Sequence, residues 1–220
     1  GFELCGSDQA GLEDVLKRHY IFPYDPDYVR SMDAEDFDSH LDIAVLGDMI
    51  TEDDSSTYKI LDKKDDKDKE EKKEYSRIKS IRSIAKNVNY SAQYLAGPEK
   101  MALTGGFDIS IARKLHGVYW ERNWAIKEVA KNQKVIRVKD QKYLINPISG
   151  FYYLLRSDKD RFSTLVQGTA SYVFDKWVGF ILDERPQLTA QYHDEIILCI
   201  RKGFREQCND MLFEALRKTN

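Results

Sequence analysis

The stretch QLTAQYHDEIILCI, residues 187–200, places two strand-like runs on either side of a short acidic turn. Strands joined by so short a turn pair antiparallel. Three more strand-like runs, KVIRV, KYLIN and FYYLL, follow one another closely between residues 134 and 155. Helical blocks separate these groups, without the regular βαβ alternation that builds a parallel sheet. The sequence therefore predicts an α+β fold.

Hydrophobic periodicity predicts the remaining elements. We expect a strand over residues 2–7 and helices over 9–20, 39–50, 76–95, 108–131, 163–183 and 204–217. Prolines in IFPYDPDY end the first helix, and Pro98 with the glycine pair at 105–106 ends the helix over 76–95. The mixed-charge run at 62–74 is typical of a solvated loop or frayed helix and marks an insertion.

Aromatic residues at helical spacing are expected in the core. They are Trp120, Trp124, Tyr172, Phe174, Trp177 and Phe180. Tyr152 and Tyr153 are neighbours on a strand, so one should be buried and the other exposed. His19 and His116 lie on helices without partner ligands, and we interpret both as packing or surface residues.

Bulk composition narrows the class of protein. With 220 residues, 42% of them hydrophobic, the chain can form one large domain or two small ones. Its net charge of −3 argues against a freestanding nucleic-acid binder, but it allows a local basic groove.

The three cysteines show no C-x-x-C spacing, which favours a reduced compartment and a chain without a disulfide or a zinc site. No apolar run reaches the roughly 20 residues of a membrane helix, and no signal peptide is evident, so no membrane partner is expected.

Carboxylates end two of the predicted strands. Asp194 and Glu195 stand in the acidic turn, and Asp8 ends the first strand. An acidic turn taken alone is common on protein surfaces. If the strands are neighbours, however, Asp8 and Asp194 converge and repel unless a hard cation neutralises them. Magnesium suits carboxylate ligands completed by water and substrate phosphates, and a pair of such ions supports nucleotidyl transfer.

A phosphate-binding surface is predicted on IRSIAKNVNYSAQY, residues 81–94. Arg82, Lys86, Tyr90 and Tyr94 recur at intervals of four and therefore share one helical face. A nucleoside triphosphate lying along this face would meet cations first and aromatic rings next. The plain alternative is an exposed cationic helix with two packed tyrosines.

Taken together, five blocks resemble the family A DNA polymerases, the bacterial polymerase I type, and especially its bacteriophage branch. SDQAGLE, RSIAKNVNYSAQY and QYHDE resemble the three polymerase motifs of that family. QGTASYVFDKW is similar to the helix before the third motif, and DSHLDIA resembles the Asp-x-His segment between the first two. The blocks keep the family's order and cover roughly residues 1–215.

The resemblance implies catalytic roles for matched positions. Asp8 and Asp194 would be the palm aspartates that bind two Mg²⁺ ions. Glu195 would be an auxiliary carboxylate near the primer terminus. Lys86 would donate a proton to the pyrophosphate leaving group. The implied activity is template-directed DNA synthesis from dNTPs, by a DNA-directed DNA polymerase.

It also implies how nucleotide and DNA are bound. Glu13 would exclude a ribose 2′-hydroxyl, Arg82 and Lys86 would bind the triphosphate, and His40 would assist. Tyr90 stands where the family has Phe or Tyr, and Tyr there is linked with weak discrimination against nucleotides without a 3′-hydroxyl. The residues implied to contact primer-template DNA are Tyr94 at the templating site, Gln167 in the minor groove, and Gln191 and His193 at the primer strand.

Some positions depart from the family pattern. Ser91 and Leu95 replace glycines usual in the second motif, so this helix is expected to bend differently near the template base. Asp14 and Val15 follow Glu13 where the family often has Leu-Arg. The insertion at 62–74 explains the long interval between the first two motifs.

The resemblance divides the chain into palm and fingers. Residues 1–50 and 135–220 would form the palm, and residues 51–134 the fingers. The thumb and exonuclease are absent from this sequence, and we expect an N-terminal thumb and exonuclease part in the same chain or in a separate polypeptide. The expected location is the cytoplasm, that of a bacterial host if the chain is phage-encoded.

Two alternatives remain open. The chain could be a non-catalytic, polymerase-like binding subunit, which the missing thumb and the replaced glycines favour. A reverse transcriptase or a single-subunit RNA polymerase shares the palm chemistry. Glu13 and the Gln-x-His-Asp-Glu form of the third motif favour a DNA polymerase over these.

Overall fold

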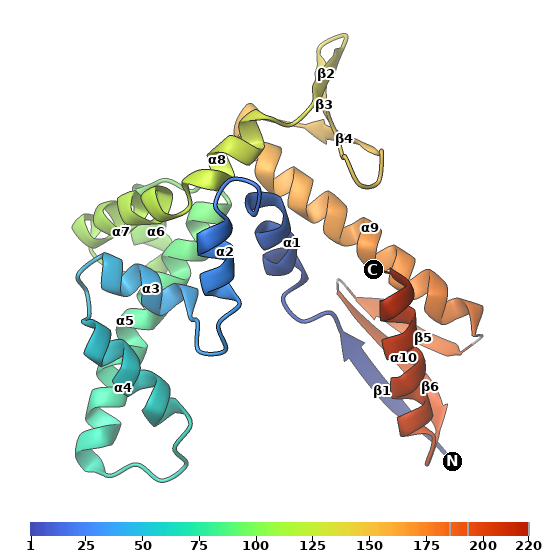
Figure 1. The fold of residues 1–220 in the computed structure, drawn as a ribbon, viewed down its shortest axis with the longest axis horizontal. Coiled ribbons are helices and arrows are strands. Elements are labelled where there is room, and N and C mark those ends of the chain that lie inside the picture. The colour runs from blue at the N-terminus through green and yellow to red at the C-terminus, as the bar shows by residue number, and fades with distance from the viewer. Residues whose placement is uncertain (185, 193, 220) are drawn as a thin grey trace. The chain divides into compact units, whose positions relative to one another are not determined.

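A computed structural model describes residues 1–184, 186–192 and 194–219 (Figure 1). It confirms the α+β class. The chain divides into two compact units, one made of residues 1–20, 133–156 and 164–220 and the other of residues 21–132 and 157–163. In the described ranges no helix combines the length and apolar character needed to cross a membrane.

The first unit contains two antiparallel three-stranded sheets. One has the order β1-β6-β5, with β1 at Phe2–Asp8, β6 at Glu195–Arg201 and β5 at Gln187–Tyr192. The other consists of β2 (Val135–Val138), β3 (Gln141–Ile145) and β4 (Tyr152–Leu155). Its helices are α1 (Leu12–Ile21), α9 (Arg161–Asp183) and α10 (Arg205–Thr219). All the predicted strands are present.

One face of the first sheet is covered by α9 and α10 (Figure 1). Alternate residues of β1 and β6 point into this core, including Cys5, Ile196 and Leu198. Trp177 of α9 is buried there, and its Nε1 donates a hydrogen bond to the carbonyl of Leu212 at 3.2 Å. The intervening residues of β1, Phe2, Leu4, Gly6 and Asp8, are exposed on the opposite face. The sheet therefore has one packed face and one open to solvent.

The second unit is helical. Its elements are α2 (Pro26–Met32), α3 (Ser39–Leu46), α4 (Glu52–Asp62), α5 (Lys69–Gln93), α6 (Pro98–Gly105), α7 (Ile109–Arg122) and α8 (Trp124–Lys131), with a 3₁₀ turn at Asp158–Asp160. The sequence pattern did not predict α2, α4 or α6. Each is short, and each begins at a strong local signal. Pro26 and Pro98 occupy first helical turns, and Thr51 forms a capping box with Asp54.

The prediction of one helix over 108–131 is wrong, because α7 ends at Arg122 and α8 begins at Trp124. Asn123 is buried between them, and its Nδ2 donates to the Tyr119 carbonyl at 3.0 Å. The interruption changes which residues face the core. Trp124 is 44% exposed, so its predicted burial is wrong, whereas Phe174 and Trp177 are buried as expected.

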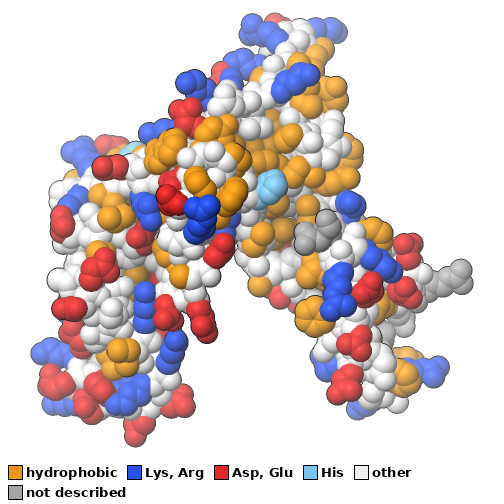
Figure 2. Space-filling model, in the orientation of Figure 1, with side chains coloured by type: hydrophobic (Ala, Val, Ile, Leu, Met, Phe, Trp, Pro, Cys, Tyr) orange, Lys and Arg blue, Asp and Glu red, His pale blue; other side chains and the backbone are white. Residues whose placement is uncertain are grey.

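The charged insertion is more ordered than predicted. The loop covers only residues 63–68, and Asp68 and Glu71 form a capping box that starts α5. Tyr58 of α4 and Tyr75 of α5 stack with their ring centroids 5.2 Å apart. Figure 2 shows acidic and basic side chains interspersed over α4 and the start of α5. Residues 69–74 are therefore the first turns of a capped helix.

Candidate functional site

Two carboxylates face each other across β1 and β6. Asp8, the last residue of β1, pairs in register with Glu195, the first residue of β6. The bonds from Gln9 N to Asp194 O and from Lys202 N to Gly1 O mark the hydrogen-bonded positions of this ladder. Asp8 and Glu195 thus form a non-hydrogen-bonded pair, in which the Cα atoms lie only about 4.5 Å apart. Both side chains lie on the face of the sheet opposite the helices.

Gly6 leaves room for one of these carboxylates. A Cβ atom at this position would lie 3.0 Å from Oε1 of Glu195. The carboxylate therefore lies over the backbone of β1, close to the end that carries Asp8.

Asp194 lies at the same end of the sheet. Its carbonyl accepts the amide hydrogen bond of Gln9 at 3.1 Å. Asp194, Glu13 and Gln167 line a small pocket of about 390 Å³ together with residues of α9. The structure thus brings together five of the predicted site residues of this unit, Asp8, Glu13, Gln167, Asp194 and Glu195, at one end of one sheet.

The remaining residues of the third motif are placed in part. Gln191 is exposed on β5 and pairs in register with Ile196. His193 lies outside the described residues.

In the Gln-Gly-Thr block of α9, Gly168 and Thr169 pack against neighbouring elements of the first unit. A Cβ atom at Gly168 would lie 2.7 Å from two ring atoms of Tyr153, whose hydroxyl donates to the Gly168 carbonyl at 3.0 Å. Thr169 is fully buried, where it accepts from Asn146 Nδ2 at 2.8 Å and contacts the Tyr20 hydroxyl at 2.7 Å. Gln167, the residue before Gly168, is exposed. Burial of Gly168 and Thr169 against the hairpin fixes the face of α9 that presents Gln167.

In the second unit, Arg82 forms an ion pair that the sequence did not predict. Its Nε donates to Oδ2 of Asp38 at 2.7 Å. Asp38 also caps α3 by accepting from the amides of His40 and Leu41. Burial would raise the pKa of Asp38, but the hydrogen bonds from the Leu41 amide, Arg82 and the His40 amide outweigh it and lower that pKa. Arg82 is thereby held in one position while it remains partly exposed.

Asn89 positions His40. Nδ2 of Asn89 donates to the Ser39 carbonyl at 2.9 Å and lies 2.9 Å from Nδ1 of His40. The Ser39 carbonyl can only accept, so it fixes the orientation of the Asn89 amide. His40 in turn lies 5.7 Å from Tyr90, centroid to centroid. Neither Asp38 nor Asn89 was predicted as a site residue, although both stand inside the motif blocks.

The remaining residues of the α5 face are exposed. Nζ of Lys86 lies 5.8 Å from the ring centroid of Tyr90. Tyr90 is 53% and Tyr94 49% exposed, so neither ring is packed in a core. Tyr94 is the C-cap of α5, which ends at Gln93. Arg82, Lys86, His40 and Tyr90 therefore form one cationic and aromatic surface on α3 and α5.

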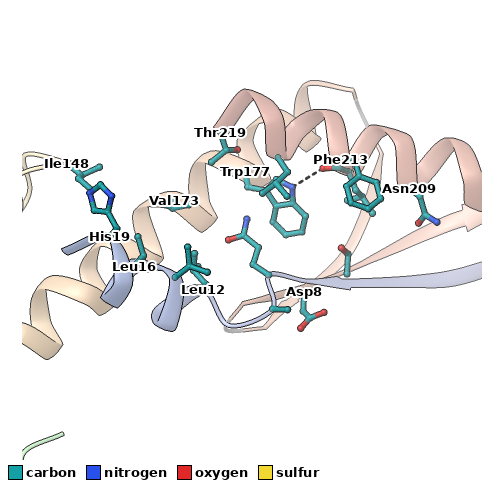
Figure 3. Close-up of a pocket in the computed structure, with 16 residues that line it drawn as sticks. Asp8, Leu12, Leu16, His19, Ile148, Val173, Trp177, Asn209, Phe213 and Thr219 are labelled. Carbon is teal, nitrogen blue, oxygen red and sulfur yellow. Dashed lines mark hydrogen bonds between the residues drawn. The ribbon is translucent and has the colours of Figure 1, made fainter. Parts of the chain in front are cut away.

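The carboxylate end of the sheet can be compared with the ligand chemistry of divalent cations. Within the described ranges, no group of three or more His, Cys, Asp or Glu side chains is arranged to hold a metal ion. Magnesium, however, commonly takes only one or two protein carboxylates, with waters and substrate phosphates as its other ligands. The carboxylate of Asp8 points away from the buried Trp177 (Figure 3). Asp8 and Glu195 supply carboxylate oxygens on one face of the sheet, which is the type of ligand that hard divalent cations prefer.

Comparisons with known proteins bear on the fold. No family model matches the chain, and no curated protein matches it. Among solved structures, the chain is similar to the POL domain of Pol1 from M. smegmatis, solved in complex with DNA primer-template and dNTP, with a TM-score of 0.57 and 14% sequence identity. The chain has a DNA polymerase-like fold. The similarity covers 99% of this chain but only 37% of that one, so the chain spans little more than a third of the polymerase chain it matches.

Proposed function

We propose that this chain is the palm and fingers part of a template-directed DNA polymerase of family A, in its bacteriophage branch. Residues 1–50 and 135–220 would supply the palm and residues 51–134 the fingers. The compact units have different bounds, because residues 21–50 belong to the helical unit. The observation that supports this most directly is the pairing of Asp8 with Glu195 on the exposed face of a sheet, with Asp194 in the adjoining turn. These are the carboxylates that the motif resemblance selects, and the polymerase-like fold supports the same proposal.

In this proposal the primer 3′-hydroxyl attacks the α-phosphorus of a dNTP. A new P–O bond forms, the bond to the bridging oxygen of the β-phosphate breaks, and pyrophosphate leaves. Asp8 and Asp194 would hold two Mg²⁺ ions, which when bound favour ionisation of the 3′-hydroxyl and neutralise charge on the phosphates. Glu195 would support the primer terminus.

The surface on α3 and α5 would bind the same nucleotide. Arg82 and Lys86 would bind the triphosphate, and Lys86 would protonate the leaving pyrophosphate. His40 would add a hydrogen-bond donor, and Tyr90 would contact the sugar. Glu13 would block a 2′-hydroxyl.

The template and primer would contact exposed side chains of both units. Tyr94 would stack at the templating base. Gln167 would reach the minor groove, and Gln191 and His193 would contact the primer strand. Whatever grips the remaining duplex would come from an N-terminal thumb and exonuclease part, in the same chain or in another polypeptide.

Nucleotide binding and primer extension test the proposal together. We expect a fluorescently labelled dNTP to bind the chain only when Mg²⁺ is present. Asp8→Ala or Asp194→Ala should abolish Mg²⁺-dependent dNTP binding and reduce primer extension by about 10²–10³-fold, by analogy with loss of a charge-stabilising group. Asp210→Ala, which removes an exposed carboxylate from α10, is the matched control and should leave both unchanged. Undiminished extension by Asp8→Ala would refute the metal assignment.

A non-catalytic binding subunit is the second candidate. It is favoured by the lack of any described group of three possible metal ligands and by the engagement of Arg82 with Asp38. Such a subunit should bind primer-template DNA equally well with and without Mg²⁺ and dNTP. A ternary complex that tightens when both are added would exclude it.

A further inference from the structure

A pair of stacked tyrosines closes the base of the charged insertion. Tyr58 of α4 and Tyr75 of α5 lie on either side of the loop over residues 63–68, and their rings are nearly parallel, with an interplanar angle of 6°. The Tyr75 hydroxyl donates to Oδ1 of Asp62 at 2.7 Å. Tyr58 is buried, so its ring is packed in place between the two helices. The insertion is therefore connected to α5 through an ordered aromatic contact.

Ion pairs add to this connection. Arg77 of α5 donates to the carboxylate of Asp54 on α4, and Lys64 in the loop donates to Glu71 of α5 at 2.7 Å. A single exposed pair contributes little to stability. Two pairs that join the same segments as the tyrosine stack, however, limit the movement of α4 along α5. Tyr58 is thus carried by a segment that is attached to α5 at several points.

Arg82 lies beside this stack. It follows Tyr75 by seven positions, about two helical turns, so both side chains lie on the same face of α5. Its Cζ lies 5.8 Å from the ring centroid of Tyr58, a distance at which a cation–π attraction acts. Asp38, the N-cap of α3, holds the same guanidinium through its Oδ2, which lies 2.7 Å from Nε and 2.6 Å from Nη2. The guanidinium therefore has two supports, a carboxylate at the start of α3 and an aromatic ring on α4.

The guanidinium keeps donors for an anion while it is held in this way. It has five N–H groups, and Asp38 takes one from Nε and one from Nη2. Three N–H groups are not used by Asp38, and the side chain is 28% exposed. A planar guanidinium with several donors in a fixed geometry is well suited to bind phosphate oxygens. The orientation of Arg82 before a ligand arrives therefore affects how strongly a phosphate can bind.

We propose that Tyr58 is a positioning residue for Arg82, and that the charged insertion sets the affinity of the chain for a nucleoside triphosphate through the Tyr58–Tyr75 stack. This role rests on the proposed function, in which Arg82 binds the triphosphate. Neither tyrosine contacts the nucleotide. Both lie outside the blocks that resemble the polymerase motifs, so the resemblance assigns them no role. An arginine whose orientation is fixed before the anion arrives loses less side-chain entropy on binding.

The test combines two measurements on the whole chain. The first is the rate at which the Nε–H proton of Arg82 exchanges with water, measured by ¹⁵N NMR without nucleotide. The second is the Kd of a fluorescently labelled dNTP in the presence of Mg²⁺. Tyr58→Leu should raise both the exchange rate and the Kd about two- to fivefold, the range that a cation–π contact supplies at a partly exposed site. Tyr58→Phe keeps the aromatic face and should restore both to the wild-type values.

Tyr28→Leu is the matched control. The Tyr28 ring centroid lies 3.8 Å from Cζ of Arg122, so this variant removes an aromatic partner from another arginine of the same unit. It should leave the exchange rate of Arg82 and the Kd of the dNTP unchanged. Tyr75→Leu is a second variant, at a position that is only partly buried. It removes the stack and should change both measurements in the same direction as Tyr58→Leu.

Two results would overturn the proposal. An unchanged exchange rate of Arg82 in folded Tyr58→Leu and Tyr75→Leu would show that the stack does not position this side chain. A raised exchange rate with an unchanged Kd would show that the insertion holds Arg82 without affecting triphosphate binding. Failure of the proposed function gives a different result, because the wild-type chain would then bind no dNTP with Mg²⁺ while the exchange rate of Arg82 still rises in Tyr58→Leu.

Discussion

Replacing Gly168 by alanine should destabilise the first unit, even though alanine favours helix formation. The added Cβ would lie 2.7 Å from two ring atoms of Tyr153, below any real Cβ contact. The ring must move, and its hydroxyl then loses the bond to the Gly168 carbonyl. Overpacking costs about 1–3 kcal/mol and the hydrogen bond about 1 kcal/mol, against about 1 kcal/mol gained by replacing a helical glycine. The net loss is about 2 kcal/mol, which lowers Tm by about 4–8 °C in a chain of this size.

The same helix supplies a matched control. Gly179 also lies on α9, but a Cβ atom there meets nothing within 4 Å. Gly179→Ala should therefore stabilise the chain by about 0.5–1 kcal/mol. The two substitutions are chemically identical, so the opposite signs isolate the contact with Tyr153. If Gly168→Ala proves as stable as Gly179→Ala, the packing argument is refuted.

Fluorescence can restrict the measurement to the unit concerned. Trp177 is the tryptophan of the first unit, and Trp120 and Trp124 belong to the second. In a background with Trp120→Phe and Trp124→Phe, urea unfolding followed by fluorescence reports on the core that contains Trp177. A double-mutant cycle completes the test. In a Tyr153→Leu background the cost of Gly168→Ala should largely disappear, because the ring that it displaces is gone.

Three further predictions concern the surface on α3 and α5. The pKa of Asp38 is lowered from 3.8 in the folded chain. Its contribution to the free energy of unfolding is therefore present above about pH 4 and is lost as the pH falls through the lowered value. Asp38→Asn should remove this part of the acid dependence of urea unfolding. Tyr90→Phe should make primer extension reject dideoxynucleotides more strongly, and an unchanged incorporation ratio would count against its proposed contact. Asn89 donates to Nδ1 of His40, so ¹⁵N chemical shifts of the neutral ring should place its proton on Nε2. Asn89→Leu removes that donor and should give a mixture of the two tautomers. A wild-type ring with its proton on Nδ1 would contradict the assignment.

Periodicity is a local property, and it predicted the strands and the long helix α9 well, although it failed to show the interruption at Asn123. β1 and β6 alternate between core and solvent, and α9 repeats its apolar face over 23 residues. The sequence predicted convergence of Asp8 with the Asp194–Glu195 turn only if their strands are neighbours, and the pairing of β1 with β6 meets this condition by placing Asp8 in register with Glu195. Short helices were missed where a proline was interpreted only as a terminator. Pro26 and Pro98 each end one segment and start the next, and a pattern of apolar residues cannot distinguish the two.

The hydrogen-bond partners of Arg82 and His40 could not be predicted from sequence periodicity. Asp38 lies 44 positions from Arg82, and Asn89 lies 49 positions from His40. Periodicity shows which residues share a face of one helix, but it carries no information about which other helix meets that face. Both partners could be located only after α3 and α5 were placed side by side.

Leu95 shows how backbone geometry can hold a residue in a conformation that it disfavours. It stands where the resembled family usually has glycine, and the expectation that the helix bends differently there stays a prediction. In the structure α5 still ends in a Schellman arrangement, with Leu95 N bonded to Ala92 O at 2.8 Å and Ala96 N bonded to Ser91 O at 2.9 Å. Leu95 adopts φ of +60°, a conformation that costs a non-glycine residue about 1–2 kcal/mol. The two backbone bonds compensate for that strain because they satisfy carbonyls at the end of the helix. The two backbone bonds therefore hold Leu95 in the left-handed conformation, and Leu95→Gly should stabilise the helix end because glycine adopts this conformation without strain.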